Sequence, residues 1–169
     1  PLRYTTASEA NSDAVANAAR ALGSVATRHA GRGAWHQLVI SGNGNRWHPA
    51  GVNRWLRDLG IFNQRSHEKR VPTAAFRLCD EQIALLLRHL WATDGTIAVR
   101  KVGKRGSHGV SFSTCSAGLA TDVAALLLRL GIVARIQVVT PKAGRPVQMV
   151  GVLGAANQQR FLDRVGAFG

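Results

Sequence analysis

The sequence predicts an α+β protein built from two related halves, and three observations point to this fold class. A stretch near the N-terminus returns in the second half of the chain with the same pattern of strand and helix. The predicted strands alternate apolar and polar residues, whereas the predicted helices carry one apolar face. Finally, 46% of the 169 residues are apolar, which is enough to bury one substantial core or two small ones.

The repeat aligns residues 2–23 with residues 110–131 without a gap. In each copy an alternating strand leads to a serine helix cap, an amphipathic helix and a terminating glycine. Residues 54–62 and 160–168 match again, at four of nine positions, as short amphipathic helices. Both halves therefore follow the order strand, helix, hairpin, helix. The identical pairs in the longer match are Thr6 and Thr114, Ser8 and Ser116, Val15 and Val123, Ala16 and Ala124, Leu22 and Leu130, and Gly23 and Gly131.

The second half contains two predicted elements ahead of its repeat copy. A helix is expected over about residues 81–94, and a strand over residues 96–101 with Ile97 and Val99 facing inward. The repeat offset of 108 residues (110 minus 2) places the equivalent elements of the first half before residue 1, so we expect that half to lack them. The predicted division is residues 1–72, the first half with a linker, and residues 73–169, the second half.

The charge of the chain points to a polyanionic partner. There are 22 Lys and Arg against 9 Asp and Glu, which gives a net charge of +13 and a pI near 11.6. No acid lies between Asp13 and Asp58, and the basic residues are spread over sequence that is predicted to fold. Nucleic acid is the first expectation. No apolar run approaches the length of a membrane span, so a membrane partner is not expected.

The cysteines and tryptophans indicate structural roles. Cys79 and Cys115 are far apart and neither belongs to a C-x-x-C pair, so we expect buried, reduced thiols and no zinc ribbon or redox motif. The tryptophans are interpreted as core and rim aromatics and not as stacking platforms for bases. They are Trp35, Trp47, Trp55 and Trp91.

Residues 87–95 (LRHLWATDG) resemble the nine-residue motif of the LAGLIDADG homing endonucleases. The match holds at Leu87, Leu90, Asp94 and Gly95 and departs at His89 and Ala92. Residues 69–72 (KRVP) resemble a Lys-x-(Ile or Val)-Pro block of the members found in inteins, and residues 2–8 and 161–169 resemble other segments of those proteins. The chain is similar to dodecapeptide-type endonuclease domains of bacterial inteins inserted in replicative DNA helicases, with the first motif missing.

This resemblance implies a fold and a site. The family fold is a tandem of αββαββα half-repeats with pseudo-two-fold symmetry and a saddle-shaped antiparallel sheet, here truncated in its N-terminal half. Asp94 and Gly95, at a negative helix end, would hold Mg²⁺ or another divalent cation that activates water for phosphodiester hydrolysis. Lys69 would lie near the scissile phosphate. Asp94 and Lys69 are therefore the candidate catalytic residues.

The resemblance also implies that strand positions opposite the apolar face, with the basic residues that lead into or lie in the turn at residues 103–109, contact double-stranded DNA. Their mixture of basic and small polar side chains suits a DNA groove. These candidates are Arg3, Thr5, Trp35, Gln37, Ala98, Arg100, Lys101, Lys104, Arg105, Ser111, Ser113, Arg135 and Gln137.

Two hypotheses of function follow. The first is a metal-dependent, site-specific DNA endonuclease domain of an intein in the bacterial cytoplasm. The splicing domain of the same precursor is then a partner, because no splicing nucleophile begins this chain and no His-Asn ends it. The second is a LAGLIDADG-derived DNA-binding module that does not cut, as in regulators or maturases. With one motif, the chain by itself is expected to bind DNA better than it cuts it, and to dimerise through the exposed motif helix.

Overall fold

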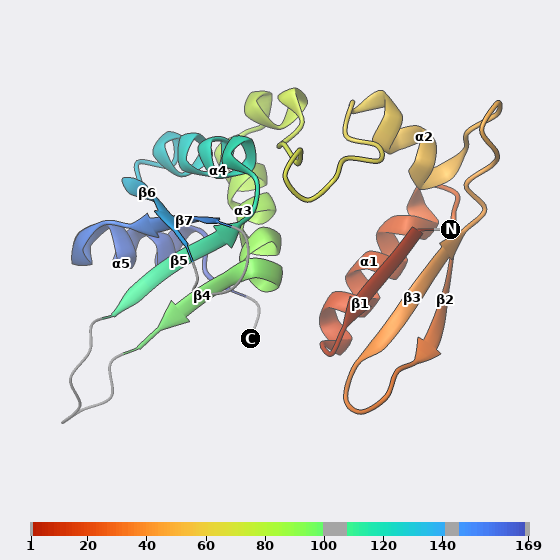
Figure 1. The fold of residues 1–169 in the computed structure, drawn as a ribbon, viewed down its shortest axis with the longest axis horizontal. Helices are drawn as coiled ribbons and strands as arrows, with labels where there is room; N and C mark the ends of the chain where they lie inside the picture. The colour runs from red at the N-terminus through yellow and green to blue at the C-terminus, as the bar shows by residue number, and fades with distance from the viewer. Residues whose placement is uncertain (1, 100–107, 141–145, 168–169) are drawn as a thin grey trace. The chain divides into compact units, whose positions relative to one another are not determined.

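The computed structural model describes residues 2–99, 108–140 and 146–167, and it divides the chain into two compact units, Pro1–Phe62 and Asn63–Gly169 (Figure 1). The division falls earlier than the expected boundary after residue 72. Val71 explains the difference, because it is buried in the core of the second unit. The linker therefore folds with the second half. Within the described ranges, the longest apolar helices are too short to span a membrane.

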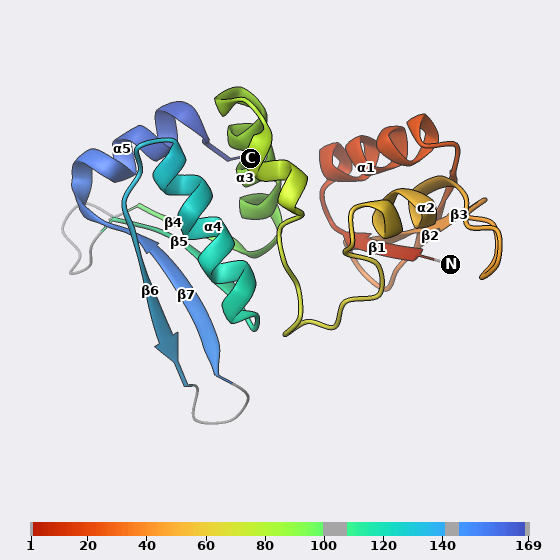
Figure 2. The ribbon, with the colours of Figure 1, turned by 90° about the horizontal axis from the view of Figure 1, so that it is seen from above.

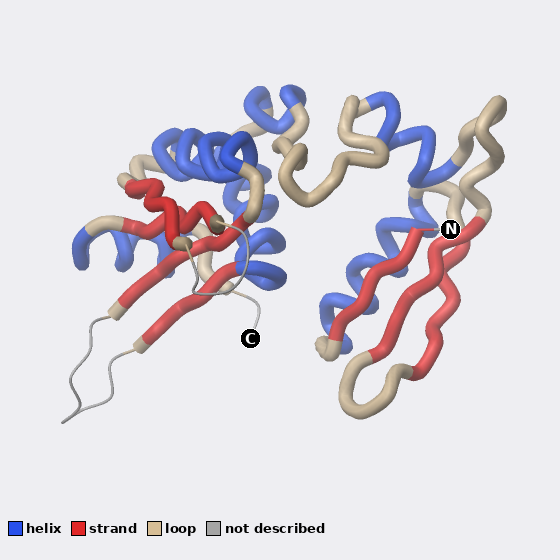
Figure 3. Tube along the Cα trace, viewed as in Figure 1, coloured by secondary structure: helices blue, strands red, loops and turns tan. Residues whose placement is uncertain are grey.

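The first unit is a three-stranded antiparallel sheet with two helices. Strand order is β1-β3-β2 (Figure 3). The buried apolar side chains are few, namely Ala16, Ala19, Leu38 and Ile40, and α2 buries none of its residues. The elements are β1 (Leu2–Thr6), α1 (Glu9–Ala21), β2 (Val25–Ala30), β3 (His36–Ser41) and α2 (Gly51–Asp58).

The second unit is a four-stranded antiparallel sheet of order β4-β5-β7-β6 with helices packed on one face (Figure 2). Its core joins α3, α5 and β5, because the Trp91 ring lies 4.7 Å from that of Phe161 and 5.5 Å from that of Phe112. The elements are η1 (Thr73–Arg77), α3 (Asp80–Asp94), β4 (Gly95–Ala98), β5 (Gly109–Thr114), α4 (Ala117–Arg129), β6 (Ala134–Val139), β7 (Val147–Val152) and α5 (Gly154–Arg164).

The structure extends the sequence repeat to its hydrogen bonds. Ser8 caps α1 by accepting from the Asn11 N–H, and Ser116 caps α4 by accepting from the Leu119 N–H. Strand registers agree as well, since the row Thr5, Gln37, His29 in the first unit corresponds to Ser113, Met149, Gln137 in the second. Three elements of the second unit, η1, α3 and β4, lack a counterpart among the described residues of the first unit. The α+β fold class is confirmed.

Three expectations about side chains were wrong. The strand after the motif helix ends at Ala98, so Val99 is 73% exposed and does not face inward. Cys79 and Cys115 are free but exposed, because one precedes α3 and the other lies in the turn before α4. Trp91 is buried in the core as expected, but Trp47 is 79% exposed. The predicted strand residues 100 and 101 lie outside the described residues.

Candidate catalytic cavity and nucleic-acid interface

Helix α3 anchors the candidate site to the core of the second unit. Ile83, Leu87 and Trp91 follow one another at four-residue spacing and are all buried, which fixes the rotation of the helix. Asp94 is then its last residue and is exposed. A carboxylate at this end adds to the negative pole of the helix dipole. The arrangement favours a cation beside Asp94.

Gly95 is required by the packing of the motif and not by an unusual backbone. Its φ is −89°, which any residue can adopt. A Cβ at this position would lie 2.4 Å from Cδ1 of Trp91 and 2.6 Å from the Trp91 Cα. Because Trp91 is packed in the core, moving either atom away would disrupt that packing and cost free energy. Glycine therefore lets the chain turn from α3 directly into β4.

A cavity of about 220 Å³ brings the two candidate catalytic residues together in the second unit. Four segments meet there: the stretch before η1, the end of α3, the connection from β5 to α4, and the start of β7. The lining residues are Ser66, Lys69, Asp94, Ser113, Thr114, Cys115, Leu119 and Val147. The cavity thus combines one carboxylate, one ammonium group and several small polar groups.

The cavity offers few protein ligands for a divalent cation. In the described part of the chain, no three His, Cys, Asp or Glu side chains form a cluster that could hold a metal. Among the described residues, Asp94 is the one carboxylate that lines the cavity. Mg²⁺ is commonly bound by one or two carboxylates together with water and substrate phosphates. The site therefore fits a cation that is bound by Asp94, by water and by the oxygens of a bound phosphodiester.

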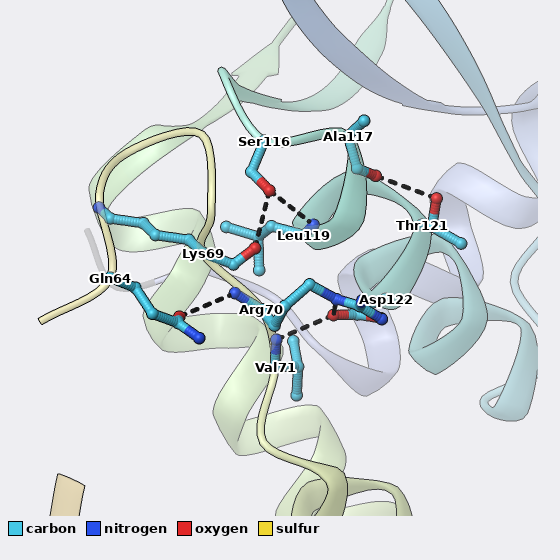
Figure 4. Close-up of polar contacts among 9 residues, drawn as sticks. All are labelled: Gln64, Lys69, Arg70, Val71, Ser116, Ala117, Leu119, Thr121 and Asp122. Atoms are coloured by element: carbon cyan, nitrogen blue, oxygen red, sulfur yellow. Dashed lines mark hydrogen bonds and ion pairs between the residues drawn. The ribbon is translucent and has the colours of Figure 1, made fainter. Parts of the chain in front are cut away.

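Lys69 is held through its backbone, which leaves its side chain available. The Ser116 hydroxyl donates a hydrogen bond to the Lys69 carbonyl at 2.7 Å and accepts the Leu119 N–H at 3.1 Å. The cap of α4 thus also fastens the segment that carries Lys69. Figure 4 shows the Lys69 side chain pointing away from its neighbour Arg70.

Asp122 forms the second attachment of this segment. Its carboxylate accepts two hydrogen bonds from Arg70, at 2.7 and 2.8 Å, and one from the Val71 N–H at 2.9 Å (Figure 4). Only 4% of Asp122 is exposed. Gly118 permits the approach, since a Cβ there would lie 2.4 Å from Cδ of Arg70. We call Arg70, Val71 and Asp122 the clamp.

The clamp holds the pKa of the Asp122 carboxyl below its ordinary value of 3.8. Burial by itself raises this pKa, but the hydrogen bonds from Arg70 and Val71 and the charge of Arg70 outweigh it. Sequence reasoning missed Asp122. A signal was available, because an acid lies beside Leu119 and Val123 on the apolar face of a helix, where an unpaired carboxylate is rare.

The predicted DNA contacts of the second unit fall on one open face of its sheet. Val110 and Phe112 face the helices, so Ser111 and Ser113 face away from them. Pairing puts Arg135 in one row with Ser111, and Gln137 in one row with Ser113. Ala98 shares this face. Thr96, which also lies on it opposite Ser111, was missed, although it alternates with Ala98.

The open face meets the cavity at Ser113, which belongs to both. A DNA backbone lying on this face of the second unit can therefore approach Lys69 and Asp94. The structure brings Lys69, Asp94 and Ser113 together in one cavity. The other basic candidates of this unit, Arg100, Lys101, Lys104 and Arg105, lie outside the described residues.

In the first unit, Arg3, Thr5 and Gln37 also share one open face. Gln37 donates a hydrogen bond to the Thr5 hydroxyl at 3.1 Å across the β1–β3 pair. Trp35 is the last residue of the β2–β3 loop, 44% exposed, with its ring against Gly31, where a Cβ would come within 2.3 Å. Each of these residues can be reached from solvent.

Several arginines on the helical side of the second unit form hydrogen bonds and ion pairs within the fold. Arg164 donates to the Leu130 carbonyl at 2.8 Å, and Arg160 donates to the Gly131 carbonyl, so both satisfy the end of α4. Arg129 and Arg164 also pair with Asp80. These side chains stabilise the fold, and the net charge therefore overstates the charge presented on the open face.

Solved structures of the homing endonuclease I-DmoI have this fold. One, from a study of its mesophilic variants, matches with a TM-score of 0.60 and 14% identity over 98% of this chain and 79% of that chain. Another, in complex with DNA and Mn, gives a TM-score of 0.62 and 12% identity over 99% and 81%. The two units thus carry the homing-endonuclease fold.

Residues 81–166, half of the chain, match the model of the LAGLIDADG-like domain. The chain therefore belongs to the LAGLIDADG-like family. It is also 49% identical over 119 residues to the replicative DNA helicase DnaB of Rhodothermus marinus, over 70% of this chain and 12% of that protein. A Synechocystis DnaB is 38% identical over 139 residues, 79% of this chain and 16% of that protein. The chain thus spans under one fifth of these relatives.

Proposed function

We propose that this chain is the DNA-binding endonuclease domain of an intein and that it hydrolyses a phosphodiester of double-stranded DNA at the Lys69–Asp94 cavity. The observation that carries the proposal is the meeting of these two side chains in one cavity at the edge of an open sheet face. A phosphodiester beside them would have its charge offset by the Lys69 ammonium.

The chain's own residues prepare the site for this chemistry. Ser116 and the clamp hold the backbone at Lys69, so the ammonium is positioned before DNA arrives. The end of α3 directs the Asp94 carboxylate into the cavity, where it would hold a divalent cation jointly with the phosphate. The chemistry that a bound cation would supply there is activation of a water molecule and stabilisation of the leaving oxygen. Exposed side chains of the open face would fix the register of the duplex.

The relatives support the intein context. They are named as replicative DNA helicases, yet this chain corresponds to only 12% and 16% of their lengths. A segment with an endonuclease fold inside a helicase is the arrangement of an intein that carries its own nuclease. The splicing domain of the same precursor is then the expected neighbour in the chain.

Binding is tested first, with a labelled duplex of mixed sequence and a salt titration. Neutralising several phosphates predicts a log–log slope of magnitude about 5 or more. A sequence selected from a random duplex library then serves as substrate in Mg²⁺ and, separately, in EDTA. Mg²⁺-dependent strand cutting that Asp94→Asn and Lys69→Met abolish, while Asp94→Asn keeps the DNA affinity measured in EDTA, is the expected result. A folded protein with a flat salt dependence contradicts the proposal.

The position of the duplex is tested with the two exposed cysteines. Cys115 lines the cavity, whereas Cys79 precedes the opposite end of the 15-residue helix α3, about 22 Å away. Bound duplex should slow the alkylation of Cys115 and leave the alkylation rate of Cys79 unchanged. Mass spectrometry measures both rates. Equal rates at both thiols with and without DNA would place the duplex elsewhere.

A second candidate function is a LAGLIDADG-derived module that binds DNA without cutting it. It is favoured because Asp94 is the one carboxylate among the described residues that line the cavity. Tight, salt-dependent binding of the selected duplex without cutting in Mg²⁺ or Mn²⁺ distinguishes this function from the first.

A further inference from the structure

A loop of nine residues interrupts the repeat in the first unit. In the second unit, Leu153 alone separates β7 from α5, whereas residues 42–50 separate β3 from α2. We call residues 42–50 the arm. The strands on either side keep the same register in both units, so the arm is an addition to the repeat and not a consequence of altered pairing.

The arm has a fixed backbone. Gly44 and Pro49 form an isolated β-bridge, and the Asn45 N–H donates to the His48 carbonyl at 3.1 Å. The Asn45 side-chain oxygen accepts the N–H groups of Trp47 and His48 at 2.9 and 2.8 Å. Gly44 has a φ of +68°, and a Cβ there would lie 2.1 Å from the His48 oxygen. The turn therefore accepts no side chain at Gly44.

This backbone presents Arg46, Trp47 and His48, all exposed, at its tip. The Arg46 guanidinium lies 5.4 Å from the centre of the Trp47 ring, and Trp47 is 79% exposed. Covering a large aromatic side chain with a partner removes much apolar surface from water, which favours binding. No acid occurs in the sequence from residue 14 to residue 57, so the local charge suits a polyanion.

We propose that the arm is a second DNA contact, in which Arg46 pairs with a phosphate and the Trp47 indole packs against the adjacent deoxyribose of the duplex. This inference rests on the proposed function, because it requires that the protein binds DNA. The open-face residues of β3 lead toward the arm, since Gln37, Val39 and Ser41 alternate along the strand to the residue before it. A duplex lying along β3 therefore extends to the arm.

The test measures affinity for a fluorescein-labelled mixed-sequence duplex at several salt concentrations. Arg46→Ala should weaken binding about tenfold and lower the magnitude of the log–log salt slope by about 1. Trp47→Ala should weaken binding about fivefold with the slope unchanged, and Trp47→Phe should retain most of the affinity. Arg20→Ala is the matched control, because it removes an exposed charge from helix α1 and should leave affinity and slope near the wild-type values.

Asn45→Ala provides a second route to the same contact. It removes the acceptor of two backbone N–H groups, so the arm loses its fixed shape while Arg46 and Trp47 remain. Affinity should fall with unchanged thermal stability of the protein. If the wild type binds the duplex and Arg46→Ala and Trp47→Ala bind it equally well, the inference is overturned, and the arm belongs to a protein partner or to none. If the wild type itself does not bind, the proposed function fails.

Discussion

A single buried carboxylate, that of Asp122, joins two segments of the second unit that are 52 residues apart at Arg70. Asp122→Asn keeps the shape of the side chain but removes its charge and replaces one of the two oxygens that accept from the Arg70 guanidinium with an NH2 group, which cannot accept. Because hydrogen bonds to charged groups contribute about 1.5–3 kcal/mol, we expect the free energy of unfolding to fall by about 2 kcal/mol in urea titrations at pH 7. Asp163→Asn is the control, since Asp163 is an exposed acid on α5 and should change little.

The same carboxylate predicts a pH dependence. The pKa of Asp122 is lower in the folded chain than its ordinary value of 3.8, so protons bind the unfolded chain more readily. Its contribution to stability is complete well above about pH 4 and is lost as the pH falls through the folded pKa. The difference in unfolding free energy between the wild type and Asp122→Asn should therefore shrink below pH 4. A constant difference down to pH 2 contradicts this account.

Two glycines within the β4–β5 pair give a matched test of packing. A Cβ at Gly95 would overlap Trp91, whereas a Cβ at Gly109 meets no heavy atom within 4 Å. Gly95→Ala should lower the free energy of unfolding by about 1–3 kcal/mol, the usual cost of overpacking a core. Gly109→Ala should be neutral or slightly stabilising, because it restricts the unfolded chain. Equal thermal shifts in the two variants would remove the packing explanation of the motif glycine.

At the scale of elements, the two faces of the sheet in the second unit predict different roles for exposed arginines. Arg135 lies on the open face, whereas Arg160 lies on α5, which packs on the other face. Arg135→Ala should weaken duplex binding severalfold and lower the salt slope by about 1, with thermal stability unchanged. Arg160→Ala should preserve the affinity and lower stability slightly, because it removes a bond to the Gly131 carbonyl. If Arg160→Ala weakened duplex binding and Arg135→Ala did not, DNA would bind the helical face of the second unit and not the open face.

The sequence predicted those elements whose causes are local. Alternation and the caps at Ser8 and Ser116 fixed the strands and the first turns of α1 and α4, and these predictions were confirmed. The end of β4 was not predictable, because it depends on the pairing of Ala98 with Gly109 and not on alternation, which continues through Val99. The arm was not predicted either, since its turn depends on contacts of Asn45 and Gly44 that no periodicity reports.

The candidate site was predictable in part. Lys69 and Asp94 were selected by resemblance, and the structure brings them into one cavity. The position of Asp122 on an apolar helix face could have indicated a buried carboxylate, but its pairing with Arg70 could not be predicted, because the two residues meet only when α4 packs beside the linker. The same packing explains why the linker folds with the second unit and not with the first.

At the scale of the whole molecule, the two units differ in how much they bury. The described residues include 19 buried apolar side chains in the second unit and 4 in the first. Because resistance to local opening follows buried apolar contacts, backbone amides of α3, α4 and β5 should exchange hydrogen far more slowly than those of α1, β1 and β3. Exchange followed by mass spectrometry measures this. Uniform protection along the chain would mean that it opens as one cooperative unit.

Because the strand register is the same in both units, equivalent positions of the two open faces have the same backbone pairing. Thr5, Gln37 and His29 occupy one transverse row in the first unit, and Ser113, Met149 and Gln137 occupy the equivalent row in the second. Side-chain identity varies between these rows while backbone geometry does not. Target preference can therefore be engineered as a modular trait, by transplanting one row onto the other unit without redesigning the backbone beneath it.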